Sequence, residues 1–241
     1  MNIAGLQKLS LVDFPGAMAA TVFFAGCNFR CPYCHNAALV VPGSDASAPA
    51  FPSIDEEAFW AFLEKRRGVL QGVCITGGEP LLRSGMETFC TRIKSMGYQV
   101  KLDTNGSRPA ELAQLVEAGL VDYVAMDVKA AWPRYAEVTG LHVEAAAPLV
   151  EAVQRSAAFL MDAGIDYEFR TTVVRELHDA PHLRRIAVQL QGARAWYLQR
   201  YVDSSDVIAG AGTFTAYSED EMRAFAEDLA GIMPCVSLRG V

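Results

Sequence analysis

The stretch "ATVFFAGCNFRCPYCHN", residues 20–36, runs from a short apolar segment straight into three cysteines, Cys27, Cys31 and Cys34. The apolar part, 20–26, is rich in β-branched and aromatic residues and predicts a strand. Three is an unusual number, because a structural zinc site uses four ligands and a disulfide framework uses an even number of cysteines. The segment therefore predicts a strand that leads into a metal-binding loop with one coordination position left open.

The same strand pattern recurs along the chain and alternates with helical periodicity. Further strands are predicted at 72–78, 98–106, 121–128, 166–174 and 195–202, and helices at 53–67, 85–97, 109–119, 147–164 and 179–190. This alternation predicts an α/β fold, an open parallel sheet with outer helices. Six units are two short of a closed eight-stranded barrel, so we expect a partial (βα)6 TIM-like barrel.

Length and composition bound the function. We expect one domain over 1–241, with a core at about 15–202 and a C-terminal helical extension at about 203–241, and a surface loop at 42–53. A net charge of −7 without a basic block argues against nucleic-acid binding. The sequence shows no signal peptide and no membrane span, and six sparse cysteines are too few for a secreted scaffold. We expect a cytoplasmic protein with reduced thiols.

Polar and glycine-rich residues follow the predicted strands where each one ends. The segments are "TGGEP" (76–80), "DTNG" (103–106), "MDVK" (126–129), "RTTVV" (170–174) and "LQRY" (198–201). Active sites of parallel α/β folds gather at the carboxyl ends of the strands. These segments therefore predict one site shared with the cysteine loop.

Cysteine thiolates hold iron–sulfur clusters, normally four to a [4Fe–4S] cluster. With Cys27, Cys31 and Cys34 alone, one iron would have no protein ligand, and an open metal site is where a substrate enters. A zinc site completed by His35 is the alternative, but His35 directly follows Cys34, and adjacent residues rarely reach one tetrahedral ion together.

The motif C-x3-C-x2-C, with Tyr33 before its last cysteine, resembles the signature of the radical S-adenosylmethionine (radical SAM) enzymes. "GLQKLSLVDFPG" (5–16) followed by "FFAGCNFRCPYCHN" (23–36) is similar to the glycyl-radical-enzyme activases. Among these it resembles most the anaerobic ribonucleoside-triphosphate reductase activating proteins, and it is similar to pyruvate formate-lyase activating enzymes. The resemblance extends from residue 3 to about 202.

The resemblance implies one [4Fe–4S] cluster and S-adenosylmethionine (SAM) as cofactors. It implies reductive cleavage of SAM to a 5′-deoxyadenosyl radical, which abstracts a glycine Cα hydrogen in a partner glycyl radical enzyme. That partner would be an anaerobic ribonucleoside-triphosphate reductase, and the electron donor a flavodoxin or ferredoxin. The protein would supply position and exclusion of water.

The resemblance also implies SAM contacts at the strand exits. Gly77 and Gly78, with Glu79, would meet the methionine end, and Asp103 its ammonium; the alternatives are an ordinary βα turn and helix capping. Asn105-Gly106 is interpreted as a turn.

Asp127 and Lys129 share one strand face and would meet the ribose and carboxylate of SAM, or simply pair with each other. In pyruvate formate-lyase activating enzymes, positions that match Asp103, Thr104, Met126 and Asp127 surround a monovalent cation.

The adenine contacts are assigned to two segments by the same resemblance, with packing as the alternative in each. They are Tyr33, His35 and Asn36 in the cysteine segment and Thr171 and Val173 on the fifth strand. A ribose contact at the sixth strand exit stays unassigned, because Gln199, Arg200 and Tyr201 stand where related activases have a histidine.

The other cysteines, Cys74, Cys90 and Cys235, lack ligand spacing and are interpreted as small buried hydrophobes, so we expect a single cluster. His142, His178 and His182 receive no role. Two alternatives to the activase remain. One is a radical SAM enzyme acting on a small molecule or peptide, such as a carboxydeazaguanine synthase. The other is a non-catalytic iron–sulfur or zinc module.

Overall fold

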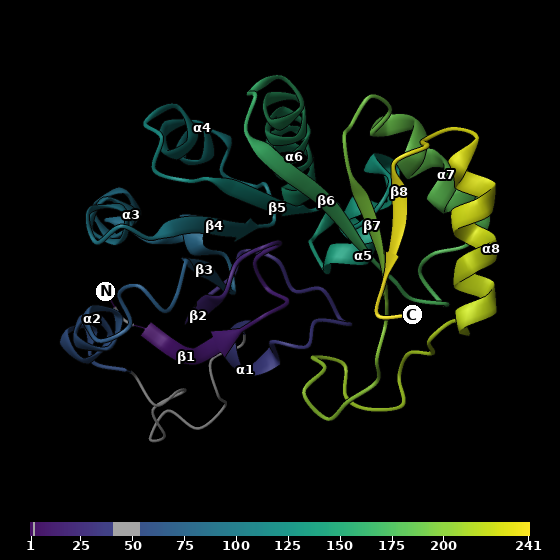
Figure 1. The fold of residues 1–241 in the computed structure, drawn as a ribbon. Helices are drawn as coiled ribbons and strands as arrows, with labels where there is room; N and C mark the ends of the chain where they lie inside the picture. The colour runs from purple at the N-terminus through teal and green to yellow at the C-terminus, as the bar shows by residue number, and fades with distance from the viewer. Residues whose placement is uncertain (2, 41–53) are drawn as a thin grey trace. The chain divides into compact units, whose positions relative to one another are not determined.

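A computed structural model of the chain describes residues 1, 3–40 and 54–241 (Figure 1). Within these residues the strands form one sheet of eight, β1 to β8, whose order follows the chain. The chain divides into two compact units. Unit 1 comprises Met1–Asn28, Ala38–Thr104 and Ala110–Val124, and unit 2 comprises Phe29–Ala37, Asn105–Pro109 and Ala125–Val241.

Unit 1 contains the first four strands. β1 (Ile3–Ser10) runs antiparallel to β2 (Ala19–Phe24), whereas β2, β3 (Gly72–Gly77) and β4 (Gln99–Thr104) are parallel to one another. The parallel arrangement brings the exits of β2, β3 and β4 to one edge of the sheet. The start of the cysteine segment, "GGEP" and Asp103-Thr104 therefore share that edge.

Helices α2 (Glu56–Glu64) and α3 (Met86–Ser95) cover unit 1 with an aromatic layer. The rings of Phe59 and Phe89 stack at 5.4 Å, and Trp60 lies 4.9 Å from Phe89. Asp55 caps α2 by accepting a hydrogen bond from the backbone N–H of Ala58 at 3.3 Å. Short α1 (Ala37–Val40), a 3₁₀ turn (Pro80–Leu82) and α4 (Pro109–Glu117) complete this part of the chain.

Unit 2 contains the parallel strands β6 (Asp166–Val173), β7 (Trp196–Arg200) and β8 (Val236–Arg239). β5 (Tyr123–Asp127) ends in this unit. Its helices are α5 (Tyr135–Thr139), α6 (Val143–Asp162), α7 (Ala180–Gln189) and α8 (Glu219–Ala230), with a 3₁₀ turn at Trp132–Arg134. Figure 1 shows α8 beside the yellow strand β8, and α7 packs against α8. A capping box between Ser218 and Glu221 fixes the start of α8.

The predicted α/β class with an open, mainly parallel sheet is confirmed. The six predicted strands correspond to β2–β7, and the predicted helices to α2, α3, α4, α6 and α7. The C-terminal tail holds the predicted helix as α8, but it also adds strand β8, which the sequence analysis did not predict. The predicted surface loop at 42–53 lies outside the described residues. None of the described helices is long and apolar enough to cross a membrane.

Candidate functional site

The second half of the cysteine segment forms a turn held by backbone hydrogen bonds. The N–H of Cys34 donates to the carbonyl of Cys31 at 3.0 Å, which closes the C-x2-C turn. The N–H of Ile208 donates to the carbonyl of Cys34 at 3.1 Å, and that of Ala209 donates to the carbonyl of Pro32 at 2.9 Å. The loop after β7 therefore holds this turn from one side.

A second contact fixes the segment from the end of α5. The N–H of Arg30 donates to the carbonyl of Thr139 at 2.9 Å, and Gly140 follows with φ +64°. A Cβ on Gly140 would overlap the carbonyl of Arg30, so only glycine permits this approach.

The three motif cysteines are accessible to different degrees. Cys31 is buried, whereas Cys27 and Cys34 are half-buried, and the six cysteines, all within the described residues, form no disulfide. In the described part of the chain no group of three His, Cys, Asp or Glu side chains has the geometry of a metal site. The cluster assignment therefore rests on the thiolate chemistry and spacing of Cys27, Cys31 and Cys34.

Tyr33 lies inside unit 2 with 3% of its surface exposed. Its hydroxyl is buried and has no hydrogen-bond partner among the described residues. Burial, and then the nearby Cys31 thiol, raises the pKa of this phenol well above its usual value, so the group is a neutral donor. A buried hydroxyl without a partner is costly and marks a position that suits a polar atom of a ligand.

His35 is exposed and lies against the end of β7. Its ring is 5.4 Å from the ring of Tyr201, and the hydroxyl of Ser204 is 3.5 Å from its Nδ1. Asn36 is half-buried. The hydroxyl of the buried Tyr201 donates to Asp203 at 3.0 Å, so Tyr201 is held in place at the exit for which no ribose contact was assigned.

In unit 1, the glycines of "GGEP" let two backbones cross at the exits of β2 and β3. The N–H of Gly78 donates to the carbonyl of Phe24, and that of Glu79 to the carbonyl of Gly26, both at 2.8 Å. Gly77 has φ +122°, and a Cβ on Gly77 or Gly78 would overlap the backbone of Phe24 or Gly26. Close backbone approach therefore requires both glycines, and their contact with SAM stays a prediction.

Glu79 links "GGEP" to "DTNG". It is fully buried, and its Oε1 accepts hydrogen bonds from the Thr104 hydroxyl at 2.8 Å and from the N–H of Leu81 at 3.1 Å. The carboxylate thus fixes the turn after β3 to the last residue of β4, which is a role within the fold.

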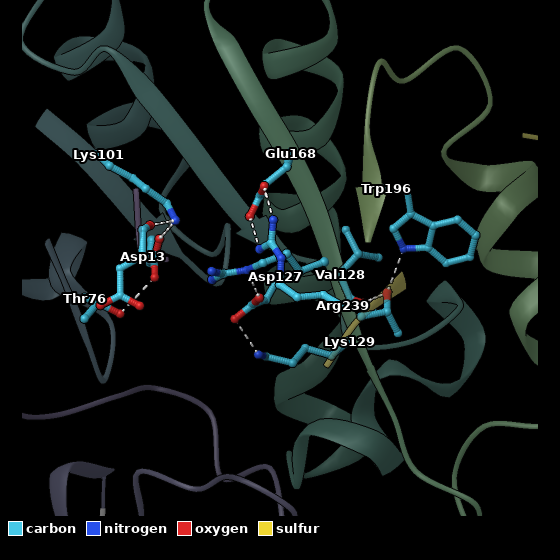
Figure 2. A network of polar contacts seen from close by, with 12 residues as sticks. Asp13, Thr76, Lys101, Asp127, Val128, Lys129, Glu168, Trp196 and Arg239 are labelled. Atoms are coloured by element: carbon cyan, nitrogen blue, oxygen red, sulfur yellow. Dashed lines mark hydrogen bonds and ion pairs between the residues drawn. The ribbon is translucent and has the colours of Figure 1, made fainter. Parts of the chain in front are cut away.

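Asp103 belongs to a polar network of unit 1 whose other members Asp13, Thr76 and Lys101 are labelled at the left of Figure 2. Its Oδ2 accepts a hydrogen bond from the Thr76 hydroxyl at 3.1 Å, and its Oδ1 is 3.4 Å from the ammonium of Lys101. Lys101, 2% exposed, also donates to the backbone carbonyl of Asp13, whose carboxylate accepts from the Thr21 hydroxyl at 2.6 Å. The network connects the predicted ammonium ligand to "VDFPG".

The predicted pair Asp127 and Lys129 is joined in unit 2 by Arg170 from β6 (Figure 2). The Lys129 ammonium is 2.9 Å from Oδ2 of Asp127, and Nε of Arg170 donates to Oδ1 at 2.9 Å. Burial opposes ionisation of Asp127, but Arg170 and then Lys129 outweigh it and lower its pKa to about 2. Burial also opposes charge on Lys129, yet Asp127 raises its pKa well above the usual value. Two cations thus share one carboxylate.

Sequence analysis did not single out Arg170. Arg170 was noted only as part of the strand exit "RTTVV". Because Arg170 directly precedes Thr171, its side chain lies on the opposite face of the strand, and this alternation was the one sequence feature that could have drawn attention to it. Arg170 and Lys129 thus both place a cationic group against the Asp127 carboxylate.

Thr171 and Val173 lie on the packed face of β6. The Thr171 hydroxyl donates to the carbonyl of Val128 at 2.7 Å and accepts from Nε1 of Trp196 at 3.0 Å, and Val173 is fully buried. Their predicted adenine contact is untested, and both side chains are engaged within the fold.

Two other predicted features are placed locally. Asn105 is part of a turn, as interpreted, because its Oδ1 accepts from the N–H of Ser107 at 2.9 Å. Met126 is buried, and its side chain packs against Gly106. The proposed cation ligands are divided between Asp103 and Thr104 in unit 1 and Met126 and Asp127 in unit 2, so the cation site stays a prediction.

The chain is similar to several known proteins. The family model described as "Radical SAM superfamily" matches residues 21–181. A protein of Methanocaldococcus jannaschii described as a glycyl-radical enzyme activating enzyme is 28% identical over 204 residues, 83% of this chain and 79% of the relative. The pyruvate formate-lyase-activating enzyme of Listeria monocytogenes is 28% identical over 135 residues, 53% of each chain.

Two further matches broaden the picture. The 7-carboxy-7-deazaguanine synthase of Methanopyrus kandleri is 34% identical over 131 residues, 48% of this chain and 51% of the relative. Among solved structures, QueE from Escherichia coli superposes with a TM-score of 0.51 at 15% identity, covering 99% of this chain and 93% of QueE. SuiB from Streptococcus suis bound to S-adenosylmethionine gives a TM-score of 0.65 at 10% identity, covering 91% and 52%. These likenesses concern the fold.

The family match covers the cysteine motif, "GGEP", Asp103, the Asp127–Lys129 pair and Arg170, and so includes every strand exit described above except that of β7. The cysteine pattern and the family model agree, and this chain belongs to the radical SAM superfamily, whose enzymes use a [4Fe–4S] cluster and SAM.

Proposed function

We propose that this protein is an activating enzyme that installs a radical on a glycine of a partner glycyl radical enzyme. The observation that carries the proposal is the similarity to the Methanocaldococcus relative, which extends over 204 residues and most of both chains. The similarity to the Listeria activating enzyme supports the same class. The "SLVDFPG" segment, in which Asp13 is tied to Lys101 and Thr21, adds the resemblance stated from the sequence.

The motif cysteines and the residues at the exits of β5 and β6 suit the cofactors of the family. Cys27, Cys31 and Cys34 would hold three irons of the cluster, which leaves the fourth iron for SAM. Lys129 and Arg170 provide the positive charge for the SAM carboxylate, while Asp127 keeps both cations in position. The buried Tyr33 hydroxyl offers a hydrogen bond to a polar atom of the adenosyl group.

The cofactors, when bound, supply one electron and a sulfonium that breaks to methionine and a 5′-deoxyadenosyl radical. The protein's part is to bind SAM in one orientation and to exclude water and other hydrogen donors from the reacting atoms. Transfer of one hydrogen atom from the glycine Cα gives 5′-deoxyadenosine and the stored glycyl radical, so the electrons balance.

The finer assignment is that the partner is an anaerobic ribonucleoside-triphosphate reductase and the electron donor a flavodoxin or ferredoxin. It rests on the N-terminal resemblance and on "LQRY" at the exit of β7, which differs from the histidine-bearing exit of pyruvate formate-lyase activating enzymes. Cation binding at Asp103, Thr104, Met126 and Asp127 belongs to the same proposal.

The test is anaerobic mixing of the reconstituted, reduced protein with SAM and a candidate reductase. We expect a glycyl doublet in the electron paramagnetic resonance spectrum and one 5′-deoxyadenosine per radical formed. The control is the same reductase with its radical glycine replaced by alanine, which should give no doublet. SAM cleavage without a doublet for any glycyl radical partner of the source organism would reject the activase and keep the superfamily chemistry.

A radical SAM enzyme for a small molecule is the second candidate. It is favoured by the 34% identity to a 7-carboxy-7-deazaguanine synthase, but that similarity covers only 48% of this chain. It predicts turnover of a small substrate with no protein partner, whereas the activase should need one.

A further inference from the structure

Two histidines that the proposed cofactor site does not use lie stacked inside unit 2. His178 and His182 are 0% and 2% exposed, with ring centroids 5.2 Å apart and ring planes at 20°. They stand four residues apart at the start of α7, where Asp179 caps the helix by accepting from the N–H of His182 at 2.8 Å. Because buried ring nitrogens need hydrogen-bond partners, the partner of each nitrogen indicates whether that nitrogen donates or accepts.

The hydrogen bonds fix both tautomers. Nδ1 of His178 accepts from the N–H of Val174 at 3.2 Å, so its Nε2 carries the proton and donates to the carbonyl of Lys129 at 2.9 Å. In His182 the backbone contacts assign the reverse roles, because Nε2 accepts from the N–H of Ala131 at 2.9 Å, which leaves the proton on Nδ1, 2.8 Å from the carbonyl of Leu177. The Arg134 guanidinium, which can only donate, lies beside this Nδ1 without a hydrogen bond to it in that tautomer. Both rings are therefore neutral and together bridge two loops.

The charges around the pair favour neutral rings. Burial lowers the pKa of His178 to about 4 and also lowers that of His182. The Arg134 guanidinium lies 3.0 Å from Nδ1 of His182, and a cation there opposes a second positive charge.

The loop so bridged carries Lys129. The carbonyl of Val128 accepts from the Thr171 hydroxyl at 2.7 Å, and the N–H of Lys129 lies 3.3 Å from the Tyr135 hydroxyl. With the histidine bonds to Lys129 and Ala131, the loop is held at four backbone groups between Val128 and Ala131. A lysine side chain has four rotatable bonds, and its ammonium can therefore reach many positions. A fixed backbone reduces the number of these positions.

The pair also touches the cysteine segment. The ring of Tyr33 meets the His178 ring edge to face, with centroids 6.3 Å apart. Tyr33, His178 and His182 thus form one row of rings that runs from the cysteine motif to the loop that carries Lys129.

We propose that His178 and His182 are positioning residues that hold the Lys129 backbone, and through it the ammonium beside Asp127, in the orientation that binds SAM. The inference rests on the proposed role of Lys129 as a SAM ligand. Neither histidine contacts the cofactor itself.

The test uses the two amides that imitate one ring nitrogen each. In His178→Gln the amide reaches the position of Nε2 and can still donate to Lys129, whereas in His178→Asn it reaches only the position of Nδ1 and Val174. We expect the Kd for SAM of the reconstituted protein to rise about tenfold or more in His178→Asn and less than about threefold in His178→Gln. Iron content should be unchanged in both.

Apo-protein melting temperatures and nitrogen-15 spectra of the histidine rings complete the experiment. A merely structural role would make the two variants equal in SAM affinity at matched iron content, and that result would overturn the inference. So would the opposite tautomer in His178. If His178→Asn does not fold, two other measurements test the positioning role. They are the tautomer of His178 in the wild type and the Kd for SAM of His182→Phe, which we expect to be raised.

Lys129→Met separates this inference from the proposed function. If Lys129→Met leaves SAM affinity unchanged, the proposed role of Lys129 fails. If it weakens binding while His178→Asn does not, only the positioning role fails. When both hold, the double variant should bind SAM no more weakly than Lys129→Met alone, because the histidine acts through that lysine.

Discussion

Residues of one type have different roles in this protein according to their surroundings. Cys31 and Cys34 share one tight turn in the cysteine segment, whereas Cys90 is fully buried on α3. Burial raises the pKa of the Cys90 thiol to about 12, which keeps this thiol protonated at neutral pH.

We therefore expect Cys31→Ala to lose the cluster and SAM cleavage, and Cys90→Ala to retain about four irons and cleavage at a stability cost of about 1 kcal/mol. Iron content and 5′-deoxyadenosine release after anaerobic reconstitution measure both. Loss of the cluster in Cys90→Ala would show that the ligands are assigned wrongly.

Single residues also show what sequence could and could not predict. Cys27, Gly77 and Asp127 stand in local motifs at strand exits, so spacing alone drew attention to them. Arg170 and His178 were missed because their partners lie far away in sequence, an Asp127 carboxylate and a Lys129 carbonyl that only the fold brings near.

At the scale of elements, the connection from β6 to α7 holds the exit of β5 through neutral histidines. His178 faces His182, the Tyr33 ring and the backbone of Val174 and Lys129. The Arg134 guanidinium contacts His182 and disfavours a positive charge on His178. A histidine whose pKa is lowered from 6.5 to about 4 on folding takes up its proton only in the unfolded chain between these values.

The stability of the fold should therefore fall as pH drops from about 6.5 to 4, by about 2 kcal/mol between pH 7.5 and 5. His178→Gln lacks the titrating ring and should lose less over the same range. Urea unfolding of the apo-protein at the two pH values measures this difference. Parallel pH dependence in wild type and variant would contradict it.

Elements were predicted well where their patterns were long. Strands β2–β7 carry apolar runs that end in turn residues, so their existence followed from periodicity. β1 alternates poorly around Gly5 and Lys8, and β8 has four residues with Arg239 among them, so neither has a strand pattern of its own. Both depend on pairing with a strand already in place, which local sequence does not encode.

At the scale of the molecule, the C-terminal strand is attached by more than backbone pairing. Arg239 of β8 forms two hydrogen bonds, at 2.7 and 2.9 Å, with the fully buried carboxylate of Glu168 on β6 (Figure 2). Its guanidinium also covers the ring of Tyr197 on β7 at 4.1 Å. Three parallel strands of unit 2 are thus tied by one guanidinium.

Arg239→Met should lower the stability by about 3 kcal/mol, because the buried Glu168 carboxylate loses the two hydrogen bonds from Arg239. Glu168→Leu combined with Arg239→Met should recover much of that loss, because the buried Glu168 carboxylate is then removed as well. Urea midpoints of the two variants and the wild type decide this, and equal midpoints for the single and double variants would contradict it.

The close approach of two backbone segments at Gly77 and Gly78 has a consequence for comparison with distantly related proteins. Any side chain at these two positions would overlap the backbone of Phe24 or Gly26. A related protein with the same close approach of the two backbones must therefore have glycine at both positions at the end of its second parallel strand, even if the spacing of its metal-binding cysteines differs. A chain with a larger residue at either position should therefore follow a different path after this strand, whatever the spacing of its cysteines.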